Sequence, residues 1–257
     1  MRLNKHPTLL LMLLILLGNQ TFAQPLRVAV AANAQGLMKR LQADFKKRTG
    51  IETEAIIGAS GKLSTQIMNG APYDVFLSAD TKFPDQLYAA GFGLRKPVIY
   101  ALGSLIICGN DKLDLNNWQN TLIGNQIKKV AIANSLTAPY GKAAEEALAF
   151  YKLDTKIKSK LIRGESISQV NTYLQTGAVT IGFTTEAFLY EDNKSGNLNW
   201  ARIDSKSYHP IAQAAILLRH AKPGKLTEAV RFFNYLTSPE AIKIISNSGY
   251  HSPITKK

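Results

Sequence analysis

The order of hydrophobic and polar residues in the first half of the chain predicts strands alternating with helices. Apolar runs of strand length alternate with segments whose apolar residues recur at helical spacing. In chain order, these five segments are 26–32, 34–50, 51–59, 62–70 and 73–79. In the longest helical segment, Leu37, Leu41 and Phe45 share one face, and Gly50 marks its end. This order is typical of a mostly parallel sheet with helices on both faces.

A second series of the same elements follows. Its strand patterns are 98–109, which is long enough for two strands, 128–134, 160–166, 178–186 and 210–218, and its helical patterns are 141–153, 167–177, 226–238 and 239–250. Residues 94–110 and 208–224 are each longer than one strand requires, so we expect the chain to pass between two lobes within them and to form a hinge. We therefore predict two α/β lobes, the first discontinuous (24–103 plus 219–257) and the second formed by 104–218.

The first 23 residues have the three parts of a secretory signal peptide. A basic start with Arg2 and Lys5 precedes the apolar run TLLLMLLILLG, which is shorter than the roughly 20 residues of a membrane span. Small residues ending at Ala23 complete the pattern, so we expect cleavage after Ala23 and a periplasmic protein. Cys108 is the only cysteine, which excludes an internal disulfide and a lipid-modified first residue.

The net charge is +13, and removal of Arg2 and Lys5 with the signal leaves +11. Such a charge is compatible with nucleic acid, a membrane surface or a small anion as the partner. The basic residues are dispersed, and the densest clusters, KKR and KSK, are not interleaved with aromatic residues as in a strand-binding groove. We therefore expect no nucleic acid partner.

Four predicted junctions between a strand and a helix carry small or hydroxyl residues. They are 31–35 (AANAQ), 58–62 (GASGK), 137–142 (TAPYGK) and 164–171 (GESISQVN). Ligands of open α/β sheets bind at the carboxyl ends of strands, where such junctions lie. The first turn of a helix presents unpaired N–H groups and the positive end of the helix dipole, so several helix starts aimed at one point form an anion site without a lysine.

Local sequence alone leaves two interpretations open for each candidate residue. The Ser60 hydroxyl either caps the helix that follows or turns toward a ligand together with the Gly61 amide. Asn33 fits a cap or turn, Tyr140 fits a half-buried aromatic residue beside a helix start, and Val170 fits the core.

Motifs for nucleotide binding, serine catalysis and metal binding are incomplete. A phosphate-binding loop needs a glycine at Ile56 and a hydroxyl residue at Leu63, and a nucleophile elbow needs a glycine at Lys62. No nucleophile, base and acid set is visible, so we do not expect an enzyme. The histidines outside the signal have no metal-ligand spacing, and we expect all of them at the surface: His209, His220 and His251.

At these junctions the chain resembles the periplasmic molybdate- or tungstate-binding proteins of bacterial ABC importers. The resemblance covers nearly all residues after the signal and is carried by VAVAANAQGLMKRL, GASGKLSTQIMNGAPYDVFLSAD, VAIANSLTAPYGKAAEEAL, GESISQVNTYLQTGAVTIGF and FFNYLTSPEAIKII. It implies a two-lobe periplasmic binding protein fold of type II with the ligand in the cleft between the lobes. It also implies an ABC permease and ATPase as partners, a monomer, and no cofactor besides the transported oxyanion.

The resemblance also implies which residues hold the anion. From the first lobe come the pair Ala32 and Asn33, and Ser60 with the Gly61 amide. From the second lobe come Tyr140 and the backbone amide of Val170. Among these, we expect Asn33, Ser60, Tyr140 and Val170 to contact the metal through the oxygens of the oxyanion. Phe183 stands where one branch of the family has a ligand-binding tyrosine, and it has no hydroxyl to donate.

Alternatives to molybdate remain open at this point. Another oxyanion, such as sulfate, thiosulfate or phosphonate, fits the same fold, and Glu165 is the one carboxylate near a junction that could accept a ligand proton. An exported transferase or hydrolase and a chaperone-like periplasmic protein are further possibilities. Neutral donors select by geometry, so we expect the cavity size to separate molybdate from the smaller sulfate, whereas tungstate is nearly the same size as molybdate.

Overall fold

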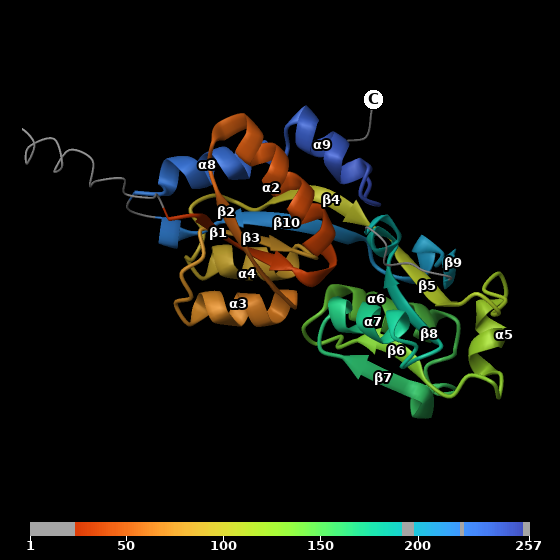
Figure 1. Ribbon diagram of the computed structural model, residues 1–257. Helices are drawn as coiled ribbons and strands as arrows, with labels where there is room; N and C mark the ends of the chain where they lie inside the picture. Colours follow the sequence, from red (N-terminus) through yellow and green to blue (C-terminus); the bar gives the residue numbers. More distant parts are fainter. Residues whose placement is uncertain (1–23, 192–197, 222–223, 254–257) are drawn as a thin grey trace, which may run out of the picture.

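The computed structural model describes residues 24–191, 198–221 and 224–253, so the predicted signal peptide lies outside the described residues. Two five-stranded sheets form the centres of two lobes (Figure 1). The strand order of the first sheet is β2 (Thr53–Gly58), β1 (Leu26–Ala31), β3 (Val75–Ser78), β10 (Ile211–Leu217) and β4 (Val98–Gly103). The strand order of the second is β7 (Leu161–Gly164), β6 (Val130–Ala133), β8 (Ile181–Thr185), β5 (Leu105–Asn110) and β9 (Leu198–Arg202).

The sheets confirm the predicted fold class, although both are mixed rather than fully parallel. In the first sheet, β1 pairs in parallel with β2 and β3, while β10 is antiparallel to both of its neighbours. The second sheet repeats this arrangement, with β6 parallel to β7 and β8 and with β5 antiparallel to both of its neighbours. In each sheet, the strand that is antiparallel to both of its neighbours is the first strand that the chain forms after it crosses from the other lobe.

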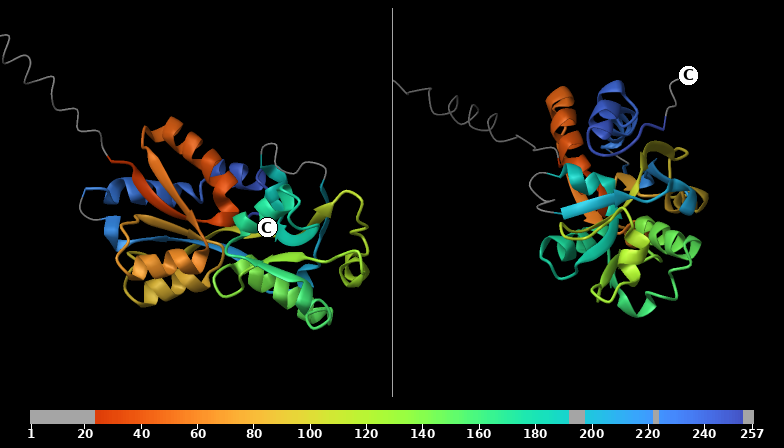
Figure 2. Two further views of the ribbon diagram at one scale, coloured as in Figure 1. Left: turned by 60° about the horizontal axis from the view of Figure 1, so that its bottom comes forward. Right: turned by 90° about the vertical axis from the view of Figure 1, so that its right-hand side faces the viewer.

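The chain passes between the lobes at two places. Leu105 begins β5 in the second sheet directly after β4 ends at Gly103 in the first. The return passage lies between β9 and β10, because Ile211–Leu217 pairs with β3 and β4. The predicted second lobe, 104–218, is therefore too long at its end, since residues 211–217 form a strand of the first sheet and Leu218 bridges to Gly93 of the first lobe. Figure 2 shows the two lobes joined by these passages.

Helices cover both faces of the first sheet because its strands alternate apolar side chains between them. One face packs against α2 (Gln35–Thr49), α8 (Leu226–Tyr235) and α9 (Pro239–Ser246). The other packs against α3 (Ser60–Met68) and α4 (Lys82–Ala89). Phe45 of α2 and Phe232 of α8 meet edge to face with ring centroids 5.1 Å apart, and Gly50 ends α2 with φ of 72°, as its position predicted.

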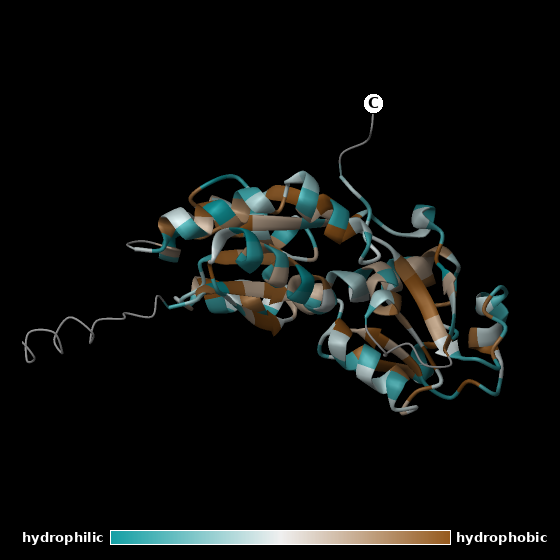
Figure 3. Ribbon diagram, turned by 45° about the horizontal axis from the view of Figure 1, so that its top comes forward, coloured by the Kyte–Doolittle hydropathy of each residue, from teal (hydrophilic) through white to brown (hydrophobic). Residues whose placement is uncertain are grey.

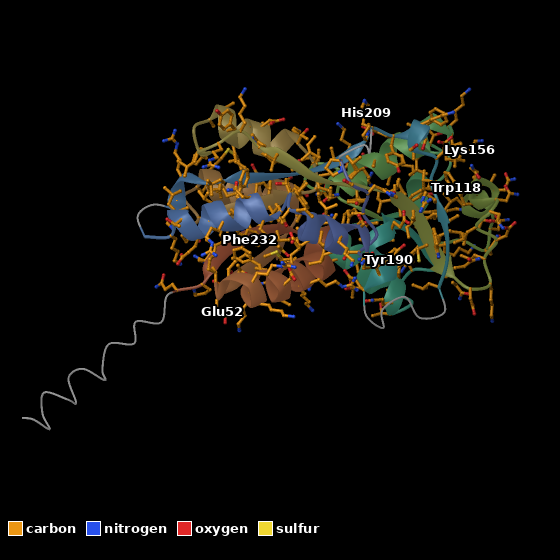
Figure 4. The ribbon with its side chains drawn as sticks, turned by 90° about the horizontal axis from the view of Figure 1, so that it is seen from above. Glu52, Trp118, Lys156, Tyr190, His209 and Phe232 are labelled. Carbon is orange, nitrogen blue, oxygen red and sulfur yellow. The ribbon has the colours of Figure 1, made fainter. Side chains whose placement is uncertain are left out.

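The second lobe has its own core around α5 (Trp118–Ile123), α6 (Pro139–Phe150) and α7 (Ile167–Gln175). Trp118 packs edge to face on Phe183 of β8 and on Tyr151, with centroid distances of 5.7 and 5.1 Å. Figure 4 places Trp118 in this lobe and Phe232 in the other. The 3-10 helices are η1 (Ala32–Ala34), η2 (Lys158–Lys160), η3 (Glu186–Tyr190), η4 (Ser205–Ser207) and η5 (Arg219–Ala221).

The central strands of both sheets are buried and hydrophobic, and hydrophilic residues are found mainly on the helices and loops (Figure 3). Cys108 of β5 is fully buried, and burial raises the pKa of its thiol to about 12. Within the described residues, no helix combines the length and the apolar character needed to cross a membrane.

Candidate functional site

A small cavity lies where the carboxyl ends of strands from both lobes face each other. The first lobe contributes residues at the ends of β1, β2 and β3, and the second contributes residues after β6 and β7. The lining residues are Ala31, Ala32, Asn33, Ala59, Ser60, Ala79, Ala138, Pro139, Tyr140 and Ile167, none of which carries a charge. The cavity leaves about 10 Å³ for the centre of a water molecule, about the room that one water needs, so it is too small for a sugar or a peptide.

Three helix starts at this cavity have no side-chain cap. Ala59, Ala138 and Ser166 are the N-cap residues of α3, α6 and α7, and none of their side chains bonds to a backbone amide of its helix. At α9, away from the cavity, Ser238 accepts a hydrogen bond of 3.2 Å from the Ala241 amide. The first residues of these helices, Ser60, Pro139 and Ile167, line the cavity, so helix starts from both lobes bring their positive dipole ends to one uncharged cavity, which favours an anion.

Ser60 lies inside the cavity as a potential donor. It is 1% exposed and is the first residue of α3, so the N-cap interpretation is wrong, and the N-cap position is occupied by Ala59. The Ser60 Oγ accepts a hydrogen bond of 3.0 Å from the backbone amide of Ala79. This bond fixes the oxygen and leaves the hydroxyl proton available for a ligand.

Asn33 and Tyr140 also line the cavity, one from each lobe. Tyr140 is 2% exposed, so it is a fully buried residue rather than a half-buried one. Burial raises the pKa of its phenol well above the usual value, which keeps the hydroxyl protonated and able to donate. Asn33 is 4% exposed, and its side-chain amide is bonded within the first lobe.

Of the predicted ligand residues, Ala32 lines the cavity as well, whereas Gly61 and Val170 are not among its lining residues. The Gly61 amide donates a hydrogen bond of 2.9 Å to the Thr137 carbonyl of the opposite lobe. A Cβ atom on Gly61 would come within 3.0 Å of the Thr137 Cα, so glycine permits this approach of the lobes. The Val170 amide donates to the Ser166 carbonyl within α7, at a long 3.3 Å.

Several residues of the site were not singled out individually in the sequence analysis, although Ile167 and Thr137 belong to its junctions. Ile167 and Ala79 line the cavity, and the buried Oγ1 of Thr137, beside the lining residue Ala138, has no hydrogen-bond partner within the described residues. Gln213 and Tyr250 accept hydrogen bonds from the side-chain amide of Asn33 and do not line the cavity. The sequence does contain a signal for Gln213: it is a glutamine within the apolar run IAQAAIL, and a buried side-chain amide requires hydrogen-bond partners.

Charged residues stand at the rim of the cleft. Lys62 of α3 forms an ion pair with Glu165, which follows β7 in the other lobe, and both side chains are about half exposed. Glu165 therefore faces a lysine and solvent and does not line the cavity.

The three histidines are exposed, as predicted. Figure 4 shows His209 near the junction of the lobes, where it contacts Glu146. Across the described residues, no cluster of three potential metal ligands occurs.

A larger open groove of about 650 Å³ follows the two passages between the lobes. Its polar lining includes Ser104, Arg202 and His251, and the Arg202 guanidinium is paired with Glu186. No residue of the four predicted junctions lines this groove. The small cavity, and not this groove, is therefore the candidate site that the four predicted junctions form.

Comparison with known proteins places this arrangement among extracellular binding proteins. Residues 26–251 match the family of bacterial extracellular solute-binding proteins. A molybdate-binding protein, ModA of Azotobacter vinelandii, is 35% identical over 89% of this chain and 90% of its own length. The solved structure of the periplasmic molybdate-binding protein of that organism has a TM-score of 0.82 and 31% identity, and the match covers 89% of this chain and all of the other.

The fold is also shared with a more distant binding protein. The sulfate-binding protein SubI of Mycobacterium tuberculosis has a TM-score of 0.75 at 13% identity, over 90% of this chain and 88% of the other. At this identity the likeness shows the fold alone.

Proposed function

Because the chain belongs to the ModA family of bacterial extracellular solute-binding proteins, we propose that it binds molybdate, or the similarly sized tungstate, in the cavity between its lobes. It would then deliver the ion, as a monomer in the periplasm, to the permease and ATPase of an ABC importer. The observation that carries this proposal is the convergence of three uncapped helix starts, from two lobes, on one uncharged cavity. Membership of a solute-binding family confirms the prediction that the chain is not an enzyme.

The donors proposed for the anion are two hydroxyls and several backbone amides. Ser60 and Tyr140 offer the hydroxyls, and Ala32, Asn33 and Val170 offer amides at the starts of their helices. A charge-assisted hydrogen bond contributes about 1.5–3 kcal/mol, so about half a dozen such bonds are sufficient without a cation in contact. The Val170 amide binds the anion only after its 3.3 Å hydrogen bond to the Ser166 carbonyl is broken.

The absence of acidic side chains from the cavity lining supports a fully deprotonated oxyanion over phosphate. A protonated oxyanion brings its own hydrogen, and an unpaired buried donor costs about 1–3 kcal/mol. Glu165, the carboxylate that could have accepted this proton, is paired with Lys62 at the rim. Sulfate needs no acceptor, and its exclusion rests on its smaller size.

Isothermal titration of the ligand-stripped protein tests the proposed function. We expect one-to-one binding of molybdate and tungstate, with no measurable heat from phosphate and at least about 100-fold weaker binding of sulfate. This ratio corresponds to about 2.7 kcal/mol, which is the cost of one or two stretched or unpaired donors. Sulfate binding as tight as molybdate binding, or no binding of any oxyanion, would contradict the proposal.

The contacts between the lobes indicate how the bound state would be held closed. The Gly61 amide reaches the Thr137 carbonyl, and Lys62 reaches Glu165, in each case across the cleft. An ion bonded to donors on both lobes would add to these contacts and shift the hinge equilibrium toward the closed form. The permease would then distinguish loaded from empty protein by this closed surface.

Replacement of Lys62 by Gln removes the ion pair across the rim. Exposed pairs contribute about 0.2–1 kcal/mol, so we expect the molybdate dissociation rate to rise about 1.5- to 5-fold in low salt and to approach the wild-type rate in high salt. Stopped-flow measurement of the dissociation rate checks this. Arg163→Gln is the matched control, because Arg163 pairs with Glu145 within the second lobe at similar exposure. Equal acceleration in both variants would assign the effect to net charge.

A further inference from the structure

A buried chain of hydrogen bonds joins the two lobes beneath the cavity. In the first lobe it contains Tyr250, Asn33 and Gln213, and in the second it contains Tyr140 and Thr185. Gln213 is the central member: it is 0% exposed, lies on β10, and contacts Asn33 on one side and Tyr140 on the other. The two residues that it contacts both line the cavity.

At one end, a backbone carbonyl fixes the direction of the bonds. The Asn33 carbonyl can only accept, so the Tyr250 hydroxyl must donate to it across 2.7 Å. The Tyr250 oxygen is then an acceptor and receives one hydrogen of the Asn33 side-chain amide, at 2.9 Å. The other hydrogen of that amide is donated to Gln213 Oε1 at 2.8 Å. Both side-chain hydrogens of Asn33 are thus used, and only its backbone N–H remains for a ligand.

At the other end, two hydrogen bonds meet at the Tyr140 oxygen. The Thr185 hydroxyl, whose Oγ1 accepts a bond of 3.2 Å from the Ala187 amide, donates to the Tyr140 oxygen at 3.1 Å. Gln213, whose Oε1 is engaged by Asn33, presents its Nε2 to the same phenolic oxygen at 3.2 Å. The Tyr140 oxygen therefore accepts two hydrogen bonds, and its own proton is left for the cavity that Tyr140 lines.

The backbone at the passage between the lobes leaves room for the contact between Gln213 and Tyr140. A Cβ atom at Gly103, the last residue of β4, would lie 2.0 Å from the Tyr140 hydroxyl and 2.9 Å from Gln213 Nε2. The pairing of β10 with β4 also shifts register between Gln213 and Ala214. A glycine and a strand irregularity thus coincide where the Gln213 side chain meets the opposite lobe.

We propose that Gln213 is a positioning residue that directs the Tyr140 O–H toward the bound anion and leaves Asn33 to bind it through its backbone amide. This inference rests on the proposed function, because it concerns the donors of that same site. Without the Gln213 amide, the phenol is free to rotate and to donate to neighbouring acceptors, so its hydrogen bond to the anion weakens.

A double-mutant cycle on molybdate affinity tests whether Gln213 acts through Tyr140. Methionine has a similar length and no hydrogen-bonding amide, so we expect Gln213→Met to weaken binding about 5- to 20-fold in the wild-type background. In the Tyr140→Phe background, which lacks the hydroxyl, the same substitution should change the affinity less than about twofold. A residue with a merely structural role would weaken binding equally in both backgrounds, and that result would overturn the inference.

Gln66→Met is the control for the chemical change itself, since Gln66 accepts a hydrogen bond of 2.9 Å from the Tyr73 hydroxyl at an exposed position of the first lobe, outside the cavity lining. We expect wild-type affinity for it. If Gln213→Met does not fold, Gln213→Glu replaces it in the cycle. Its carboxylate accepts from both neighbours and draws the phenolic proton away, so the loss should again be larger with Tyr140 than with Phe at that position.

The outcomes separate the inference from the proposed function. If the wild-type protein does not bind molybdate, the proposed function fails whatever Gln213 does. If it binds and the Gln213 substitution has no effect, or the same effect with and without the Tyr140 hydroxyl, only the inference about Gln213 fails.

Discussion

Replacement of Ser60 by alanine is expected to weaken molybdate binding about 10- to 150-fold while the protein remains folded. The Ser60 hydroxyl is buried in the cavity, and its oxygen accepts a hydrogen bond from the Ala79 amide, so its proton is available to a ligand. Loss of one charge-assisted hydrogen bond to the anion costs about 1.5–3 kcal/mol, which gives this range. Isothermal titration measures the affinity, and the melting temperature without ligand reports folding.

Ser64→Ala is the control for this substitution. Ser64 lies on the same helix, is 2% exposed and does not line the cavity, so the change removes an equally buried hydroxyl from α3. We expect its affinity to stay within about twofold of wild type. If Ser60→Ala retained full affinity, the Ser60 hydroxyl would not be a ligand donor, and the anion would be held by backbone amides and Tyr140 alone.

Replacement of Gly141 by alanine is expected to destabilise the second lobe. A Cβ atom there would lie 2.2 Å from the Ala133 carbonyl oxygen and 2.7 Å from its carbon, which are backbone atoms at the end of β6 and cannot rotate away. Overpacking of this kind costs about 2–3 kcal/mol, which lowers the melting temperature by about 4–12 °C in a chain of this size. Because α6 carries Tyr140, we also expect weaker molybdate binding. Thermal unfolding and titration of the same preparation check both effects.

The corresponding control is Gly58→Ala. The nearest atoms to a Cβ atom at Gly58 are Cδ2 and Cγ of the Leu63 side chain, both at 3.2 Å, and a side chain can move. We expect this variant to unfold within about 3 °C of wild type. A similar loss in both variants would mean that the cost comes from the glycine backbone rather than from the clash with Ala133.

The elements were predictable wherever one period of apolar residues dominates. The segments that became β1, α2, α3, α6 and α7 had clear spacing and recognisable ends. Helix α4, in contrast, has Pro84 in its first turn, where the missing N–H is tolerated although proline usually signals a turn. The sheet that receives β10 was not predictable, because its pairing with Leu77 and Ala101 depends on the arrangement of distant segments.

The candidate site shows the same division between local and distant information. The junction pattern and the resemblance pointed to Ser60, Asn33 and Tyr140, which the fold brings to one cavity. Gln213 bonds to Asn33, 180 residues away in the chain, and no local spacing reveals such a pair. Local sequence also left a capping role open for Ser60, and the structure excludes it because the helix begins at Ser60 itself.

The single cysteine has a practical consequence for following the hinge in solution. Thiol reagents require the thiolate, and burial in β5 together with a pKa of about 12 keeps Cys108 unreactive in the folded protein. A cysteine introduced on the surface would therefore take up a fluorescent dye selectively, without removal of the native residue. Leu136 offers a place for it, since its side chain is 82% exposed and its neighbour Thr137 meets Gly61 of the opposite lobe. With a dye at that position, the emission would report the arrival and departure of the oxyanion in real time.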